Sequence, residues 1–78
     1  MLTLKLISEN EQELVFNYHP EGNSEFGTIV VNKRSEELHL LHDAENDEFG
    51  IYKVHAVSKI KEYLQNKVFL KETTVAWY

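Results

Sequence analysis

Hydrophobic and polar residues alternate along the beginning of the chain. Leucines at every second position from Leu2 to Leu6 give the period of two that is typical of a half-buried strand. After a wholly polar stretch, residues 8–13, the alternation resumes from Leu14 to Tyr18. Pairing Leu4 with Phe16 sets every large apolar residue of both strands on one face. The pattern therefore predicts a hairpin in this register.

Two further strands are predicted from the composition of the next segment. Pro and Gly favour a loop, because Pro fixes φ and Gly tolerates positive φ, whereas β-branched residues favour a strand. The expected order is loop, strand, turn and strand: Pro20–Gly27, Thr28–Lys33, Asn32–Glu37 and Leu38–His42. The register of this hairpin stays open, because Leu40 and Leu41 are both apolar and face opposite ways on a strand. Either Val30 with Leu41, or Ile29 with Val31, joins the face that a helix does not cover.

The period changes to that of a helix after an acidic stretch, residues 43–48. The pattern predicts an amphipathic helix from about Phe49 to Asn66. Asn46 or Asp47 is the expected N-cap, with acidic residues at the positive end of the helix dipole. The apolar residues of the helix gather on one side: Ala56, Val57, Ile60, Tyr63 and Leu64.

These elements predict a single α+β domain over residues 1–78. The order is ββββα with a closing β from Thr73 to Tyr78, which has the composition of a strand. We expect an antiparallel four- to five-stranded sheet with one amphipathic helix packed on one face. The last segment is either a strand of the same chain or an arm that crosses to a second subunit, because large aromatic residues favour burial.

The charge balance narrows the classes of partner. The chain has 13 acidic and 8 basic residues, which gives a net charge of −5 with neutral histidines. Such a balance disfavours binding to the phosphates of DNA or RNA, which depends on clustered Lys and Arg. The absence of cysteine excludes disulfides, thiolate zinc ligands and a cysteine nucleophile. No stretch has the pattern of a signal peptide or a spanning helix, so we expect a cytoplasmic protein with no membrane partner.

Three segments resemble those of small uncharacterised bacterial proteins of similar length: Glu21–Gly27, Ala44–Gly50 and Val75–Tyr78. The similarity spans most of the chain. Because such proteins carry no assigned activity, the resemblance implies no functional residue. It favours an accessory protein over a familiar enzyme.

Four histidines among many carboxylates suggest a metal site as one hypothesis. Imidazole and carboxylate groups suit zinc and similar ions, and His19, His42 and Asp43 are the candidate ligands. On a strand, however, His39 and His42 lie on opposite faces, and their spacing matches no metal signature. We therefore predict no metal, no cofactor and no catalytic residue. A small metal-dependent enzyme that uses His and Asp residues is the alternative function.

The face of the sheet that the helix leaves uncovered carries a mixture of apolar and polar side chains. Such a surface is typical of one that a partner covers at times, although scattered surface aliphatics would give the same pattern. We predict interaction through this face and the tail, by Val15, Asn17, His19, Val30, Leu41, Trp77 and Tyr78. The predicted function is a non-enzymatic binding domain whose partner is another protein or a second copy of the chain. An acidic decoy that imitates nucleic-acid phosphates ranks third, because the acidic residues are split among several turns.

Overall fold

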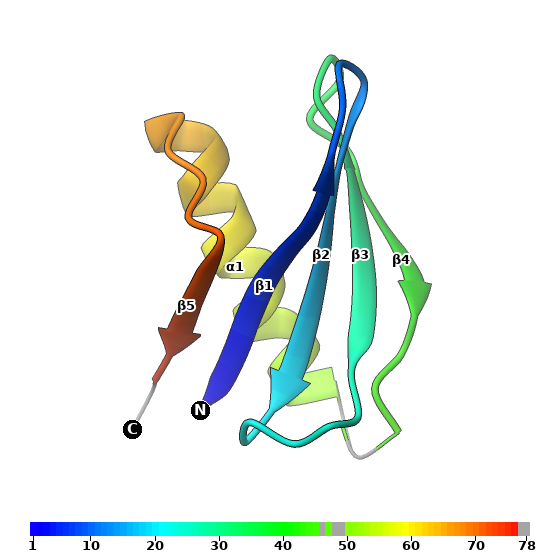
Figure 1. Ribbon diagram of the computed structural model, residues 1–78, viewed down its shortest axis with the longest axis vertical. Coiled ribbons are helices and arrows are strands. Elements are labelled where there is room, and N and C mark those ends of the chain that lie inside the picture. Colours follow the sequence, from blue (N-terminus) through cyan, green and yellow to red (C-terminus); the bar gives the residue numbers. More distant parts are fainter. Residues whose placement is uncertain (46, 48–49, 77–78) are drawn as a thin grey trace.

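A five-stranded antiparallel sheet with one helix packed on it forms the fold, which confirms the predicted α+β class (Figure 1). The computed structural model describes residues 1–45, 47 and 50–76. Its elements are β1 (Leu2–Glu9), β2 (Glu13–Pro20), β3 (Gly27–Asn32), β4 (Leu38–His42), α1 (Ile51–Asn66) and β5 (Glu72–Val75). The strands lie in the order β4-β3-β2-β1-β5, so β4 and β5 form the two edges. In the described part of the chain, no helix has both the length and the apolar character that crossing a membrane requires.

The first hairpin is present, but its register differs from the predicted one. Leu4 pairs with Tyr18, and Phe16 pairs with Leu6 instead. The predicted pairing of Leu4 with Phe16 is wrong because the apolar pattern has a period of two. A shift of two residues keeps every side chain on its face, so the pattern alone does not distinguish the two registers.

The turn between β1 and β2 sets the observed register. Asn10 Oδ1 accepts hydrogen bonds from the backbone N–H groups of Gln12 and Glu13, at 2.7 and 2.8 Å. This Asx turn joins β1 to β2 through residues 10–12, a shorter connection than the polar stretch of residues 8–13 suggests. A bulge at Ile7, between the paired residues Leu6 and Ser8, leaves the Ile7 side chain 54% exposed.

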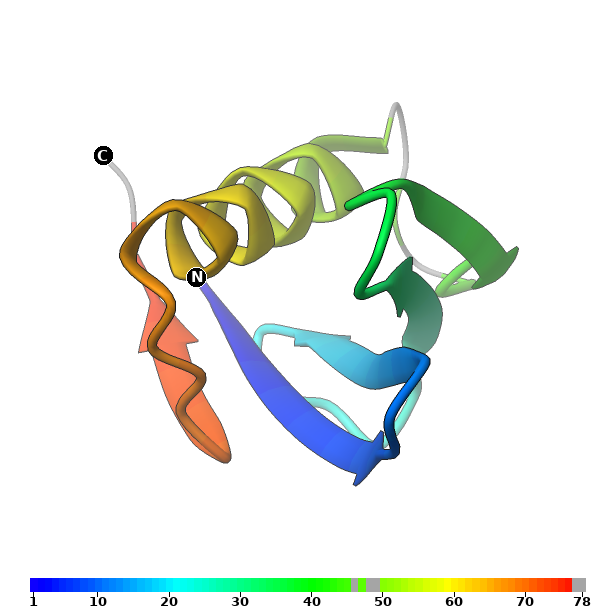
Figure 2. The ribbon, with the colours of Figure 1, turned by 90° about the horizontal axis from the view of Figure 1, so that it is seen from above.

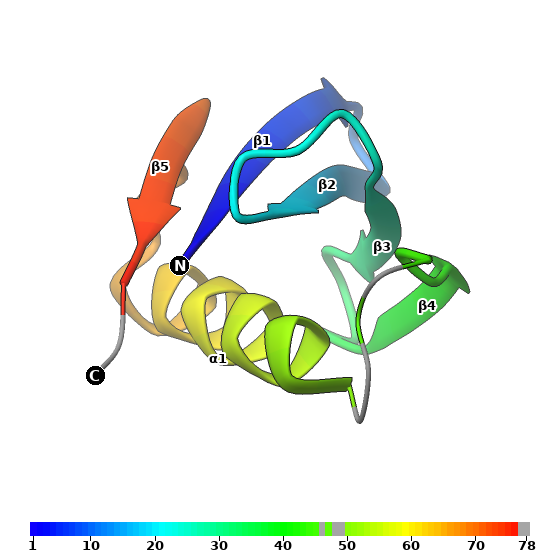
Figure 3. The same cartoon turned by 90° about the horizontal axis from the view of Figure 1, so that it is seen from below.

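The apolar face of the sheet and the apolar side of α1 form one core. The largest fully buried side chains are Tyr18, Phe16, Leu2, Leu4, Leu14, Ile29, Ile60 and Val31. The predicted helix face is confirmed, because Ala56, Ile60 and Tyr63 are buried and Val57 and Leu64 pack against them. The helix contacts β2, β1 and β5, and the sheet curls around one side of it (Figures 2 and 3).

The β3–β4 hairpin has the register that the sequence left open. Ile29 and Val31 are buried in the core. Val30 therefore points to the other side of the sheet, which we call the outer face, and pairs there with Val15 and His39.

A bulge at Leu41 breaks the regularity of β4. Ile29 pairs with Leu40, whereas Thr28 pairs with His42, so Leu41 is the extra residue. The bulge turns His42 to the outer face, the face that also carries His39. The prediction that these two histidines lie on opposite faces is therefore wrong, because it assumed an unbroken strand.

The N-cap of α1 is Gly50, so the prediction of Asp47 as the N-cap is wrong, although the Asp47 side chain bonds to the first helical turn. Its two carboxylate oxygens accept hydrogen bonds from the backbone N–H groups of Tyr52 and Lys53, both at 2.9 Å. These amides belong to the first helical turn, where N–H groups have no partner within the helix. Gly50, with φ of 68°, occupies the boundary itself, so the carboxylate acts from outside the helix. The other predicted N-cap, Asn46, lies outside the described residues.

The C-terminal segment forms a strand of the same chain. Leu2 pairs with Val75 and Leu4 pairs with Thr73, so β5 extends the sheet beside β1. This is the intrachain alternative of the two that the sequence allowed. The predicted ends of the elements at Phe49 and at Trp77–Tyr78 lie outside the described residues.

Candidate functional site

The outer face of the sheet carries most of the residues that the sequence predicted for interaction. Val15 and Val30 form a cross-strand pair there, and both are half-buried, as is Asn17. Asn17 Oδ1 accepts a hydrogen bond from Thr28 Oγ1 at 2.9 Å, and Thr28 is only 8% exposed. This pair of polar side chains in the middle of the face is therefore bonded within the sheet and partly shielded from solvent.

An aromatic cluster covers the part of the outer face near the end of β4. The Phe26 ring lies near both His19 and His42, with ring centroids 5.3 Å and 6.3 Å away. His19 Nδ1 is also 2.9 Å from the Asn23 carbonyl oxygen. The described residues contain no group of three or more His, Asp or Glu side chains that could hold a metal ion. The candidate ligands His19, His42 and Asp43 are therefore not gathered into a metal site there.

Leu41 is the most exposed of the predicted interaction residues that the structure describes. Its side chain is 72% exposed at the bulge of β4. The two aromatic residues predicted to take part, Trp77 and Tyr78, lie outside the described residues.

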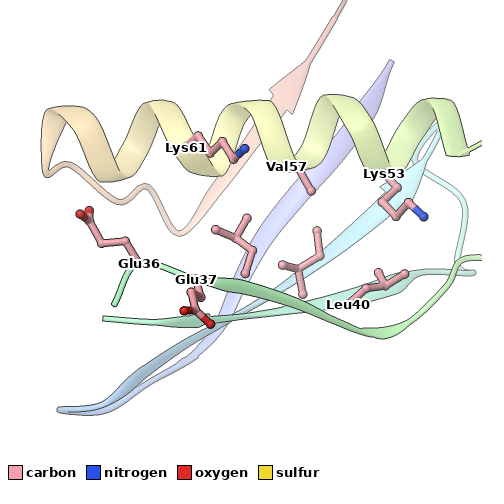
Figure 4. Close-up of a pocket in the computed structure, with 8 residues that line it drawn as sticks. Glu36, Glu37, Leu40, Lys53, Val57 and Lys61 are labelled. Carbon is pink, nitrogen blue, oxygen red and sulfur yellow. The ribbon is translucent and has the colours of Figure 1, made fainter. Parts of the chain in front are cut away.

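An open groove lies between β4 and α1, on the side of the sheet that faces the helix. Its volume is about 550 Å³, and its lining consists of Ile29, Glu36, Glu37, Leu38, Leu40, Lys53, Val57 and Lys61. Figure 4 shows Lys53, Val57 and Lys61 on the helix, across the groove from Glu36, Glu37 and Leu40. Leu40 lies on the core face of the sheet, yet it is 40% exposed. The groove thus exposes apolar surface that belongs to the core face.

The groove was not predicted from the sequence, although one signal for it was present. A helix about 10 Å wide covers roughly two or three strands that are spaced about 4.8 Å apart. The sheet has five strands, and α1 packs on β1, β2 and β5. The apolar residues of β4 are consequently left with incomplete cover.

The backbone of β4 is open along the same groove. The Asn32 N–H donates to the Glu37 carbonyl at 2.9 Å, which fixes Glu37 as a residue bonded to β3. Because bonded residues alternate along an antiparallel ladder, Leu38 and Leu40 direct their N–H and C=O groups away from β3. The sheet order places no further strand of the described chain beyond β4. The groove therefore has a free strand edge as one of its borders.

The two edges of the sheet differ in their chemistry. On β5, Glu72 carries a charge and lies 3.9 Å from Lys5 in an ion pair. On β4, the segment Leu38–His42 contains no Lys, Arg, Asp, Glu or Pro. Charged residues and Pro are the common means by which natural sheets prevent pairing at an edge. The β4 edge lacks both means within the strand.

Charged side chains surround the apolar part of the groove. Lys53 Nζ lies 3.9 Å from Asp43 Oδ1, in a partly exposed ion pair. Lys61 forms no ion pair with the residues whose positions are described. Glu36 and Glu37 lie at the start of β4, at the other end of the groove from Lys53 (Figure 4). The groove is thus apolar along its length and charged at its ends.

The titratable groups with clearly shifted pKa lie away from the groove. Burial raises the pKa of Tyr18 and of Tyr63 above the ordinary value. Hydrogen bonds from the Met1 amino group and the Tyr52 hydroxyl lower the pKa of Glu21. A shifted acid or base inside a cleft is what would point to catalysis, and these shifts follow instead from core packing and a surface contact.

Comparison of the chain with protein-family models, with curated proteins and with solved structures gave no match. The groove is therefore interpreted from its own geometry.

Proposed function

We propose that the protein is a non-enzymatic binding domain that docks an extended segment of a protein partner at the open edge of β4. The observation that carries this proposal is that the outward backbone groups of Leu38 and Leu40 border an apolar groove. A strand added at such an edge gains main-chain hydrogen bonds, and pockets for its alternate side chains give specificity. The partner's side chains on the groove side would cover Leu40 and Val57.

The shape and charge of the groove favour an extended segment of mixed composition. Its volume of about 550 Å³ is lined by apolar side chains in the middle and by Lys53 and Lys61 along the helix. We expect apolar residues at alternate positions of the segment, because they would pack over Leu40. We also expect an acidic residue near Lys61, whose ammonium group would then gain a charge-assisted hydrogen bond.

Selection from a random peptide library tests the proposal. Peptides displayed on phage are selected on the immobilised wild-type protein and then compared on two variants. Leu40→Glu introduces a charge into the groove, and Ile7→Glu is the matched control, because Ile7 is an exposed apolar residue on a bulge of β1. We expect selected peptides to bind the Ile7→Glu variant like the wild type. Binding to the Leu40→Glu variant should weaken about tenfold or more, which corresponds to about 1.4 kcal/mol.

The location of binding gives the second readout. Amide chemical shifts should move along β4 and on the groove side of α1 when a selected peptide is added. The proposal fails if no peptide distinguishes the wild type from Leu40→Glu. It also fails if the shifts cluster around Val15 and Asn17, because the outer face would then be the binding surface.

A further inference from the structure

We infer that the segment docked at β4 is the β4 strand of a second copy, so that two chains form a symmetric dimer with one continuous sheet. This inference rests on the proposed function, because it uses the same edge and the same groove. A two-fold symmetric interface requires a surface that is complementary to itself. An antiparallel strand edge meets this requirement. Each outward residue donates its N–H to the residue opposite it and accepts a hydrogen bond from that residue at its own C=O.

The regular part of β4 determines the register of the pair. The backbone groups that point outward belong to Leu38 and Leu40, and the bulge at Leu41 ends the regular ladder beyond them. The centre of this stretch is His39. Pairing Leu38 with Leu40 of the second copy therefore places His39 beside its own symmetry mate, in the non-hydrogen-bonded position of the new ladder.

The side chains agree with this register. Leu38 and Leu40 lie on the groove side of the sheet, so each would form an apolar cross-strand pair with the other copy. This contact would cover Leu40, which is 40% exposed. Val57, which lines the groove on α1, adds apolar surface across the groove from Leu40 (Figure 4). The apolar surface left open in one chain is thus the surface that the second copy would bury.

The charges lie at the two ends of β4 and not within the strand that would pair. The acidic residues Glu36 and Glu37 precede β4, whereas Lys53 lies at the groove end where the strand finishes (Figure 4). Antiparallel pairing places the start of one strand beside the end of the other. Glu36 of the second copy, which lines the groove, would therefore approach the groove end where Lys53 lies 3.9 Å from Asp43. The strand between these ends contains no Lys, Arg, Asp or Glu.

Burial at this edge would also support a small core. A chain of 78 residues buries a smaller share of its surface than a large domain does, and association is one common compensation. The second edge, β5, is less suited to the role, because Glu72 places a charge within that edge strand.

A single cysteine at position 39 tests the inference directly, because the chain has no cysteine of its own. In a non-hydrogen-bonded cross-strand pair the Cβ atoms lie about 4.5–5.5 Å apart, close to the separation that a disulfide needs. The His39→Cys variant should therefore form a covalent dimer rapidly under mild oxidation. Thr74→Cys is the matched control, because Thr74 is an exposed strand residue on the opposite edge of the sheet. It should cross-link much more slowly.

Sedimentation of variants without cysteine gives the independent readout. The wild type and Ile7→Glu should form dimers as the concentration rises to the millimolar range, and Leu40→Glu should remain monomeric. Circular dichroism melts establish that each variant is folded. The inference is overturned if the folded wild type stays monomeric, or if His39→Cys cross-links no faster than Thr74→Cys. The peptide selection then still tests whether β4 binds another protein, so the two failures are distinguishable.

Discussion

Gly27 occupies a position where the neighbouring strand leaves no room for a side chain. It pairs with Tyr18, and a Cβ atom added to Gly27 would overlap the Tyr18 ring. The ring cannot move away easily, because it is fully buried and its hydroxyl accepts a hydrogen bond from the Ala44 N–H at 3.3 Å. The glycine is therefore required by space and not by a turn.

The Gly27→Ala variant is expected to lose stability. Overpacking of a well-packed core costs about 1–3 kcal/mol, and this overlap falls in the upper part of that range. Urea unfolding measures the change, with Ser24→Ala in the exposed loop as the control. If both variants unfold at the same urea concentration, the Tyr18 ring does not occupy the space above Gly27.

Glu21 gives the molecule a pH-dependent contact. Its Oε2 atom accepts hydrogen bonds from the Met1 amino group at 2.6 Å and from the Tyr52 hydroxyl at 2.9 Å. These bonds lower the pKa of Glu21 below the ordinary value of 4.5. Because the folded-state pKa is the lower one, the ionised carboxylate adds stability above pH 4.5, and this stability is lost as the pH falls through the folded-state pKa.

The Glu21→Gln variant should therefore be less stable than the wild type near neutral pH. The difference in the free energy of unfolding should shrink in acid, where the wild-type carboxyl is protonated as well. Urea titrations across this pH range measure it, with Glu11→Gln as the control at an exposed turn residue. A difference that is constant with pH would show that the contact does not depend on the charge of Glu21.

At the scale of the elements, alternation predicted the faces of the strands but not their pairing. Leu4 and Phe16 lie on the predicted face, yet they pair with Tyr18 and Leu6. The pairing is decided by the hydrogen bonds of the turn at Asn10, which a pattern of apolar residues does not contain. The helix was predicted more closely, because its apolar side is defined by residues at both three and four positions apart.

The bulges were the features that alternation could not predict. A bulge adds one residue to one strand, so every residue beyond it changes face relative to an unbroken pattern. This is why His39 and His42 share the outer face. The groove results instead from the width of α1, because one helix does not cover all five strands. The function class stays a prediction from composition, and the location of the candidate surface required the sheet order.

The edge strand β5 supplies a test of the ladder itself. The Leu6 N–H donates to the Lys71 carbonyl at 2.8 Å, so alternation directs the Thr73 N–H toward β1 and the Thr74 N–H toward the open edge. Thr73→Pro removes a bonded donor from the ladder, whereas Thr74→Pro removes a donor that faces solvent.

We expect Thr73→Pro to be clearly less stable than Thr74→Pro in thermal melts. Pro within a hydrogen-bonded stretch of a strand loses a ladder bond, while Pro on the free side of an edge is tolerated. Equal melting temperatures for the two variants would contradict the observed pairing of β5 with β1.

At the scale of the whole molecule, the fold is held by one apolar core that α1 and the sheet share. The candidate metal ligands His19 and His42 each lie near the Phe26 ring, and the core is built from apolar side chains. A structural metal contributes to folding free energy when its ligands organise the fold. The described residues offer no such organising ligand set.

Thermal melts with and without a strong chelator should therefore superimpose. The wild-type protein, purified without added metal, is compared with a sample incubated with the chelator and then dialysed. A fall of several degrees in the melting temperature would contradict this expectation and would favour the metal-dependent alternative.

The central claim is that the β4 edge is the surface through which this protein binds its partner. Amide hydrogen exchange tests it most directly, because the outward N–H groups of Leu38 and Leu40 are the atoms that a docked strand would use. Their exchange should slow when a selected peptide is added or when the protein concentration rises. The outward amide of Thr74 on the opposite edge should keep its rate. If the Leu38 and Leu40 amides exchange at the same rate under all these conditions, nothing docks at β4 and the claim is wrong.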